Sequence, residues 1–150
     1  MNNLSRLVST FFGVGYFPLI PGTTASFISA ALYYFFLRNQ PNILILILIL
    51  FLTVTGIPTS TASEKYFLKK DAKPIVIDEV IGQIVSLFMI PATQKNVLLG
   101  FILFRFFDIA KPFPARYLQR LNGGWGIVLD DVFAGIWANI FLRILITIFK

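Results

Sequence analysis

Fifteen consecutive residues, Ile43 to Ile57, consist almost entirely of isoleucine, leucine, phenylalanine and valine. Isoleucine and leucine alternate here, but both are apolar, so the alternation lacks the period-2 polarity that indicates a strand. We interpret the segment as a lipid-facing helix. At about 1.5 Å per residue it measures roughly 22 Å, which is short of a hydrocarbon core of about 30 Å. Local thinning of the bilayer or additional flanking residues must therefore complete the span.

The composition agrees with a membrane location. Hydrophobic residues make up 57% of the 150 residues and charged residues only 13%, whereas soluble domains carry about a quarter charged residues. The net charge of +6 then indicates loops that face an anionic leaflet rather than nucleic acid. We predict a single membrane domain, 1–150, because no linker divides the chain.

Five apolar segments are predicted to be helical. Thr23 is the expected N-cap of the first segment, and Pro74 ends a short amphipathic helix that Thr61 or Ser63 begins. The third and fourth segments are too short to span comfortably, so we expect a tilted or re-entrant hairpin. The predicted fold is all-α, a compact multi-pass membrane bundle with short or re-entrant helices. The segments are 22–37, 43–57, 80–90, 96–107 and 132–149.

Counting one side change per segment places the N-terminus and the loops 59–79 and 108–131 on one face. That face holds eight basic residues and the other only three, so the positive-inside rule predicts that it is cytoplasmic. Five of the seven carboxylates fall at helix ends on this face, where a charge costs less than at the bilayer centre. They are Asp78, Glu79, Asp108, Asp130 and Asp131.

Small residues accompany these acids four positions along the chain: Gly82 follows Asp78, and Gly135 follows Asp131. Small residues allow close helix approach in membranes, so carboxylates from different helices are expected to meet. The chain has no histidine or cysteine, and clustered oxygen ligands suit Mg²⁺ or Mn²⁺. We therefore predict that all five carboxylates are metal ligands, and that these five residues and Lys111 are catalytic.

Several basic and backbone groups are candidate phosphate ligands. Pro21-Gly22-Thr23-Thr24 offers N–H groups at a helix N-terminus, although the same pattern also fits an ordinary N-cap. Lys111 lies on a constrained turn near Asp108, whereas Arg116 and Arg120 fit lipid-headgroup contact equally well. The predicted phosphate-binding residues are Gly22, Thr23, Thr24, Arg105, Arg116, Gly123 and Gly124. Metal, basic residues and membrane together indicate phosphate-ester chemistry on a lipid, with a carboxylate activating water and protonated Lys111 assisting the departing alkoxide.

Three blocks closely resemble a known family, phosphatidylglycerophosphatase A. They are FPLIPGTTAS at 17–26, IVIDEVIGQIVSLF at 75–88 and FRFFDIAKPFPARYLQRLNGGWGIVLDDVFAG at 104–135. The resemblance implies a compact all-helical, Mg²⁺-dependent phosphatase at the cytoplasmic face of the bacterial cell membrane, which converts phosphatidylglycerophosphate to phosphatidylglycerol and phosphate. It implies a phospholipid substrate, contact with membrane lipids and no nucleic acid, and it names no protein partner. The chain lacks any histidine in the loop before Asp78, unlike some relatives.

Two other functions remain open at this point. One is a phosphatase or phosphotransferase that acts on a different phospholipid. The other is a small cation transporter, which would place its acids near the bilayer midplane on a route to both sides. A purely structural scaffold has no need of clustered acids.

Overall fold

The computed structural model describes residues 3–149, and within that range the chain forms helices and no strand. The prediction of an all-α fold is therefore confirmed. Two helices, α3 and α7, are long and apolar enough to cross a membrane. The elements are α1 (Asn3–Ser9), η1 (Val14–Tyr16), α2 (Pro21–Leu32), η2 (Tyr33–Leu37), α3 (Asn42–Phe67), α4 (Ile77–Leu87), α5 (Gln94–Ala110), α6 (Ala115–Leu118) and α7 (Gly124–Ile148).

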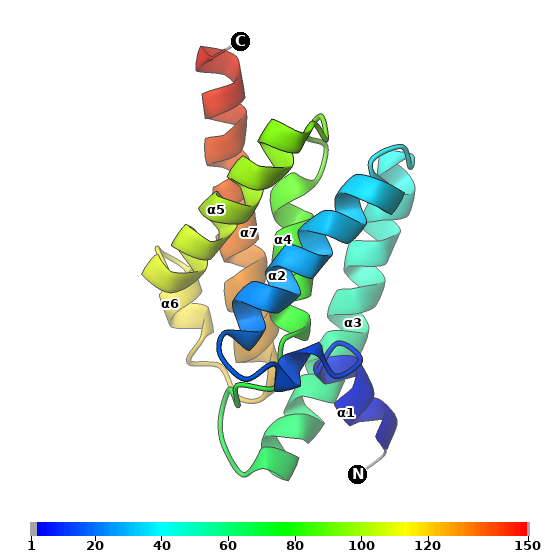
Figure 1. Cartoon of the computed structure of the whole chain (residues 1–150). Helices are drawn as coiled ribbons and strands as arrows, with labels where there is room; N and C mark the ends of the chain where they lie inside the picture. The colour runs from blue at the N-terminus through cyan, green and yellow to red at the C-terminus, as the bar shows by residue number, and fades with distance from the viewer. Residues whose placement is uncertain (1–2, 150) are drawn as a thin grey trace.

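The short helix α4 lies at the centre of the bundle, where α2, α3, α5 and α7 surround it (Figure 1). Nine of its eleven residues are buried, because its neighbours cover almost its whole circumference. Ser29 of α2 donates a hydrogen bond to the Val80 carbonyl at 3.1 Å, and Tyr33 of η2 donates one to the Leu87 carbonyl at 2.8 Å. Two consecutive elements that precede α4 in the chain, α2 and η2, therefore hold both of its ends in place.

Helices α4 and α7 cross closely because each has a glycine at the contact. A Cβ on Gly82 would stand 2.6 Å from the Asp131 carbonyl oxygen, and one on Gly135 would overlap the Gly82 carbonyl oxygen and come within 3.0 Å of Val85 Cβ. No side chain larger than hydrogen fits at this crossing. The prediction that small residues beside the acids permit close approach is confirmed for Gly82 and Gly135.

The C-terminal end of α4 lies inside the bundle, so its last carbonyls need donors from elsewhere. Asn139 of α7 supplies them, with its amide nitrogen 3.3, 3.0 and 2.8 Å from the carbonyl oxygens of Val85, Ser86 and Phe88. Arg143 donates to Asn139 Oδ1 at 2.8 Å and to the Phe88 carbonyl at 3.2 Å. These two polar residues allow a helix of eleven residues to stop within an apolar bundle.

The prediction of a short span at 43–57 followed by a separate amphipathic helix is wrong. Helix α3 runs for 26 residues through Pro58, or about 39 Å at about 1.5 Å per residue. The polar residues that indicated a break instead contact α1: Ser63 and Ser9 share a hydrogen bond of 2.7 Å. Neither Thr61 nor Ser63 is an N-cap, and Thr61 bonds back to the Ile57 carbonyl.

Two predicted helix starts are also wrong. Helix α2 begins at Pro21, with Ile20 at the N-cap position, so Thr23 lies inside the first turn and does not cap it. Proline suits this first position because its fixed φ already fits a helix. Helix α7 begins at Gly124 rather than at residue 132. Asp130 and Asp131 therefore lie in its second turn and not at its end.

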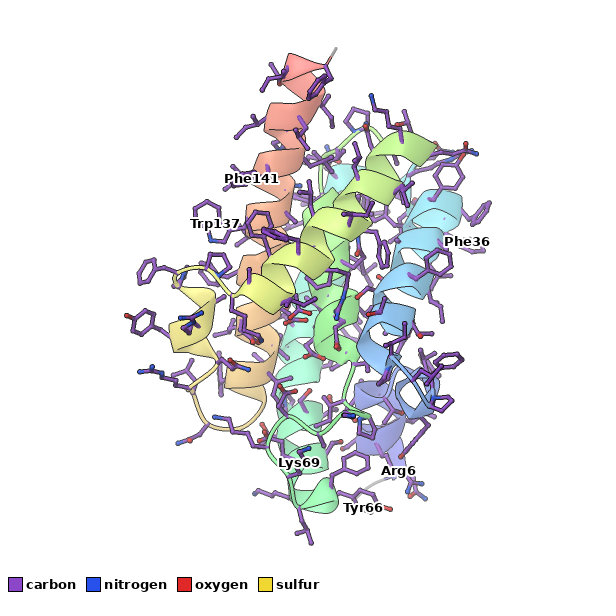
Figure 2. The ribbon with its side chains drawn as sticks, turned by 60° about the vertical axis from the view of Figure 1, so that its left-hand side comes forward. Arg6, Phe36, Tyr66, Lys69, Trp137 and Phe141 are labelled. Carbon is purple, nitrogen blue, oxygen red and sulfur yellow. The ribbon has the colours of Figure 1, made fainter. Side chains whose placement is uncertain are left out.

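The connections divide between the two ends of the bundle as the sequence predicts. The α2–α3 and α4–α5 turns lie at one end, while α1 and the loops before α4 and α7 lie at the other (Figure 1). Figure 2 shows Arg6, Tyr66 and Lys69 together at this second end, and Phe36, Trp137 and Phe141 nearer the first. Arg6 donates to the Tyr66 hydroxyl at 3.0 Å. Which end faces the cytoplasm stays a prediction.

A methyl group at the helix crossing should destabilise the bundle. We expect Gly135→Ala to force α4 and α7 apart, at a cost of about 1–3 kcal/mol from overpacking. Gly56→Ala is the matched control, because its Cβ would come close only to the flexible end of Ile81, at 3.2 Å, and would lie at ordinary contact distance, 3.6 Å, from Ile77. Both changes gain the same helix propensity. A lower thermal midpoint in detergent for Gly135→Ala than for Gly56→Ala is expected, and equal midpoints would contradict the close crossing.

Removing the Asn139 amide should also destabilise the protein. Asn139→Leu keeps the approximate volume and leaves the end of α4 without its main donor, at a cost of about 1–3 kcal/mol. Thr147→Val is the control, since its hydroxyl only bonds back to the Arg143 carbonyl on an exposed face. Thermal unfolding in detergent should show a clear drop for the first variant and little change for the second. A similar stability of both variants would exclude this capping role.

Candidate active site

Three carboxylates from two helices converge at the end of the bundle that carries α1. Asp78 and Glu79 belong to the first turn of α4, and Asp131 to the second turn of α7. Each offers an oxygen atom within 4.8 Å of the other two. Asp78 is 6% exposed and Asp131 3% exposed. The predicted meeting of acids from distant parts of the chain is present in the structure.

Local packing explains this convergence. Asp78 precedes Gly82 by one helical turn and Asp131 precedes Gly135 by one turn, so the glycine crossing sets the two acids side by side. Gly22 in the first turn of α2 lies against Glu79, and a Cβ at this position would overlap the Glu79 carboxylate. Thr23 and Thr24 occupy the same turn of α2. The structure thus brings the predicted 22–24 segment to the acidic cluster.

The three carboxylates lack enough protein partners for their burial. Asp78 Oδ1, Glu79 Oε2 and Asp131 Oδ2 are buried and have no hydrogen-bond donor among the described residues. Burial raises the pKa of Asp78 well above its ordinary value, and the adjacent Glu79 carboxylate adds to the shift. Buried charges are normally paired or coordinate metals. One unpartnered oxygen from each acid therefore gives a group that could hold a cation.

Lys111 joins the other two predicted acids. It follows α5 with a left-handed φ of 45°, and its ammonium pairs with Asp130 and lies 3.8 Å from Asp108 Oδ1. Arg105 binds the other oxygen of Asp108 at 2.8 Å and lies 3.5 Å from Ser26 Oγ of α2. Burial lowers the pKa of Lys111, but Asp130 raises it more, so it lies above its ordinary value.

Asp108 and Asp130 lie close to the cluster of three acids but have different contacts. Asp131 is within electrostatic range of both. In the structure, however, Asp108 and Asp130 face the basic side chains of Arg105 and Lys111. The five predicted acids thus form one group with two parts. Asp78, Glu79 and Asp131 have no basic side chain paired with them, and Asp108 and Asp130 form a lysine-bridged part around Lys111.

Two other predicted phosphate ligands, Gly123 and Gly124, lie apart from the acids. Gly124 donates its N–H to Thr61 Oγ1 of α3 at 2.7 Å, and a Cβ on Gly123 would stand 2.8 Å from the same oxygen. This contact with α3 occupies the Gly124 N–H that was predicted to bind phosphate. Arg116 lines a separate basic cleft with Lys70, Asp71, Gln119, Arg120 and Ile127.

Sequence reasoning missed Ser26 and Asp71. Ser26 is fully buried beside Arg105, and Asp71 is within electrostatic range of Lys111 and Asp108. The proximity of Ser26 to the PGTT motif was a usable signal. Asp71 lies between lysines in KKDAKP, a pattern typical of a solvated loop, so no local pattern marked it as a site residue.

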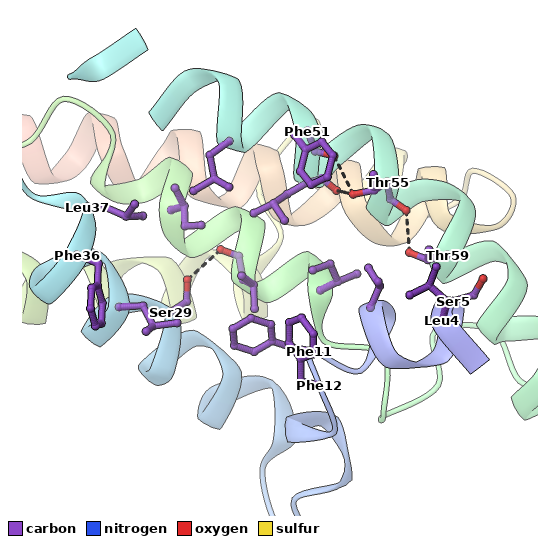
Figure 3. Close-up of a pocket in the computed structure, with 17 residues that line it drawn as sticks. Leu4, Ser5, Phe11, Phe12, Ser29, Phe36, Leu37, Phe51, Thr55 and Thr59 are labelled. Carbon is purple, nitrogen blue, oxygen red and sulfur yellow. Dashed lines mark hydrogen bonds between the residues drawn. The ribbon is translucent and has the colours of Figure 1, made fainter. Parts of the chain in front are cut away.

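An apolar cavity of about 630 Å³ lies on the other side of α4, among α1, α2 and α3 (Figure 3). Leu4, Phe11, Phe36 and Phe51 are among its lining residues, and none of the lining residues carries a charge. The hydroxyls of Ser29, Thr55 and Thr59 donate to helix carbonyls, as Thr59 does to Thr55 O at 2.8 Å (Figure 3). This cavity offers no group for acid–base or metal chemistry.

The residue types at the site restrict the ligands that it can bind. Oxygen ligands without histidine or cysteine suit a hard divalent cation, and Arg105 and Lys111 add positive charge beside it. A phosphate group is the natural anion for this combination of cation, arginine and lysine. One of the two helices that carry the acids, α7, is long and apolar enough to cross a membrane.

Comparison with known proteins agrees with this chemistry. A family model for Phosphatidylglycerophosphatase A matches residues 7–146. The Phosphatidylglycerophosphatase A of Escherichia coli strain K12 is 32% identical over 138 residues, which cover 91% of this chain and 80% of that protein. That of Haemophilus influenzae is 49% identical over 72 residues, covering 47% of this chain and 44% of that protein.

A third relative carries another name. A Bacteroides thetaiotaomicron protein, named provisionally as a phosphatidylinositol-3-phosphatase, is 32% identical over 148 residues, covering 94% of this chain and 92% of that protein. No solved structure matches. The match of the family model over nearly the whole chain decides the assignment: this chain belongs to the phosphatidylglycerophosphatase A family of phosphatases.

Proposed function

We propose that this protein is a Mg²⁺-dependent phosphatase that hydrolyses phosphatidylglycerophosphate to phosphatidylglycerol and phosphate. The observation that carries the proposal is the convergence of Asp78, Glu79 and Asp131, each with one buried oxygen lacking a partner. Family membership supplies the phosphatase chemistry. The proposed location is the bacterial cell membrane, with the site facing the cytoplasm.

The three acids fit a divalent cation on electrostatic grounds. Two carboxylates about 4.8 Å apart repel each other by roughly 3 kcal/mol at an effective dielectric constant of about 20. A buried group of three must therefore take up protons or hold a cation, and all-oxygen ligands favour Mg²⁺. When bound, Mg²⁺ supplies Lewis-acid polarisation of a phosphoryl oxygen.

The chain's own residues then have separable tasks. A carboxylate of the cluster accepts a proton from the attacking water as the water oxygen bonds to phosphorus. The bond from phosphorus to the glycerol oxygen breaks, and that oxygen takes a proton back from the same carboxyl group or from water. Lys111 is a poor proton donor because pairing with Asp130 raises its pKa. We therefore assign Lys111 a fixed positive charge that binds a phosphoryl oxygen, instead of the proton transfer expected from the sequence.

Asp108 and Asp130 are proposed to position Lys111 and Arg105. Both acids were predicted to bind metal, but their contacts are with these two basic side chains. Arg105 also has a buried Nε without an acceptor among the described residues, which leaves a donor free for a phosphate oxygen. Gly22 allows α2 to approach Glu79, so we place the N–H groups of Gly22 and Thr23 near the proposed phosphate. Thr24 was also predicted to bind phosphate, but its N–H and its hydroxyl both donate to the Ile20 carbonyl at 3.0 Å.

Phosphatidylinositol 3-phosphate is a second candidate substrate. The Bacteroides relative with the corresponding name is as similar to this chain as the Escherichia coli protein is, each at 32% identity. The family model favours phosphatidylglycerophosphate. Phosphate release from both lipids, measured with one preparation in detergent, would decide between them.

Neutralising one acid of the cluster should abolish both metal binding and turnover. For Asp131→Asn we expect at least a 100-fold lower rate of phosphate release, comparable with the loss of an electrostatic catalytic group. We also expect loss of the Mg²⁺-dependent rise in thermal midpoint that a ligand of the folded state produces. Glu64→Gln is the control, since Glu64 is outside the cluster and only accepts the Asp71 N–H. A variant that kept both properties would refute the metal site.

Changes at Lys111 should separate catalysis from stability. Lys111→Met leaves Asp130 buried without its partner, which typically costs about 3–5 kcal/mol, and removes the charge that binds phosphate. The double variant Lys111→Met/Asp130→Asn should recover most of the thermal midpoint and remain inactive. Recovery of phosphate release in the double variant would show that Lys111 has only a structural task.

A further inference from the structure

A second polar cleft, of about 500 Å³, lies beside the proposed active site between α6 and the loop that joins α3 to α4. Its lining residues are Lys70, Asp71, Arg116, Gln119, Arg120 and Ile127. Three of these side chains are cationic and one is anionic, which leaves a net of two positive charges (3 − 1 = 2). The cleft is therefore electrostatically suited to an anion.

The cations of this cleft are not neutralised by the protein. Among residues 3–149, no carboxylate lies within ion-pair distance of Lys70, Arg116 or Arg120. Lys70 donates to the Leu121 carbonyl at 3.3 Å, and the Arg120 guanidinium lies 5.4 Å from the Tyr117 ring centroid. These contacts hold two cations in place and leave their charge available. Two arginines also match phosphate well, because the planar guanidinium binds two phosphate oxygens at once.

The cleft lies near the site. Ile127, which lines the cleft, lies on α7 one turn before Asp130 and Asp131. From the opposite wall, Asp71 is within electrostatic range of Lys111 and Asp108. An anion in the cleft would therefore be a close neighbour of the lysine-bridged part of the active site.

We propose that the cleft is a second phosphate-binding subsite, which holds a phosphate group through Arg116, Arg120 and Lys70 without a divalent cation. This inference rests on the proposed function, because it assigns the neighbouring carboxylates to the reacting phosphomonoester. The phosphate group has two possible sources. Phosphatidylglycerophosphate also carries a phosphodiester, which phosphatidic acid lacks, and the reaction itself releases inorganic phosphate.

The test uses the full-length protein in non-ionic detergent. Arg116→Gln/Arg120→Gln removes two charges from the cleft. Lys65→Gln/Lys69→Gln is the matched control, because it removes two charges from exposed side chains near the end of α3, outside the cleft. Three quantities are measured: kcat/KM for phosphatidylglycerophosphate and for phosphatidic acid, the inhibition constant of inorganic phosphate, and the affinity for inorganic phosphate by calorimetric titration in EDTA.

If the subsite holds the phosphodiester, the ratio of kcat/KM for phosphatidylglycerophosphate to that for phosphatidic acid falls about tenfold in the cleft variant, as loss of one charge-assisted hydrogen bond predicts. If it holds released phosphate, the inhibition constant rises about tenfold while the ratio stays constant. Either result supports the subsite and names its ligand. A cleft variant that matches the control in all three quantities overturns it.

Failure of the proposed function has a different signature. Wild-type protein that releases no phosphate from either lipid would refute the phosphatase assignment. The calorimetric titration does not depend on turnover, and EDTA leaves the carboxylate cluster without a cation, so the cluster repels phosphate. In that case the titration alone decides: a tenfold weaker phosphate affinity in the cleft variant would still support the subsite, and equal affinities in the wild type, the cleft variant and the control would exclude it.

Discussion

The contact between α4 and α7 at Gly82 and Gly135 determines the position of every other part of the site. Each glycine lies against backbone or a rigid side chain of the other helix, with no room for a Cβ. Because Asp78 and Asp131 are each one turn before a glycine, their side chains meet wherever the glycines do. The same two glycines that bring the helices together thus set the spacing of the carboxylates, so the geometry of the site depends on helix packing.

A short helix at the centre of an apolar bundle has polar groups without hydrogen-bond partners at both ends, and the two ends of α4 differ in how these groups are satisfied. At the C-terminal end of α4, the free carbonyls accept hydrogen bonds from Asn139 and Arg143 of α7, so the polar groups are satisfied within the protein. At the N-terminal end, Asp78 and Glu79 leave oxygens without protein donors. The carbonyls at one end of α4 are therefore satisfied within the protein, and the acids at the other end have buried oxygens that could hold a cation.

Much of the fold and the site was accessible from the sequence because the signals were chemical and local. Charged residues are scarce in this chain, so five acids at helix ends were easy to recognise as candidates. The spacing of Asp78 to Gly82 and of Asp131 to Gly135 predicted the close helix crossing. The errors came from polar residues with two possible meanings. Serines and threonines after Ile57 resemble a helix break, but Ser63 bonds to Ser9 of α1, a tertiary contact that no local pattern reveals. Thr23 likewise resembles an N-cap, but it lies inside the first turn of α2.

The division of the acids into two parts could not be predicted, because it depends on the path of the chain between α5 and α7. Lys111 turns back in a left-handed conformation, and this places its ammonium between Asp108 and Asp130 rather than in solvent. The sequence shows five acids and several bases without showing which pair. Once Lys111 and Arg105 are taken by two acids, only Asp78, Glu79 and Asp131 keep unsatisfied oxygens. Pairing within the protein thus leaves three of the five acids with buried oxygens that could hold a cation, and it leaves the paired lysine as a positive charge near them.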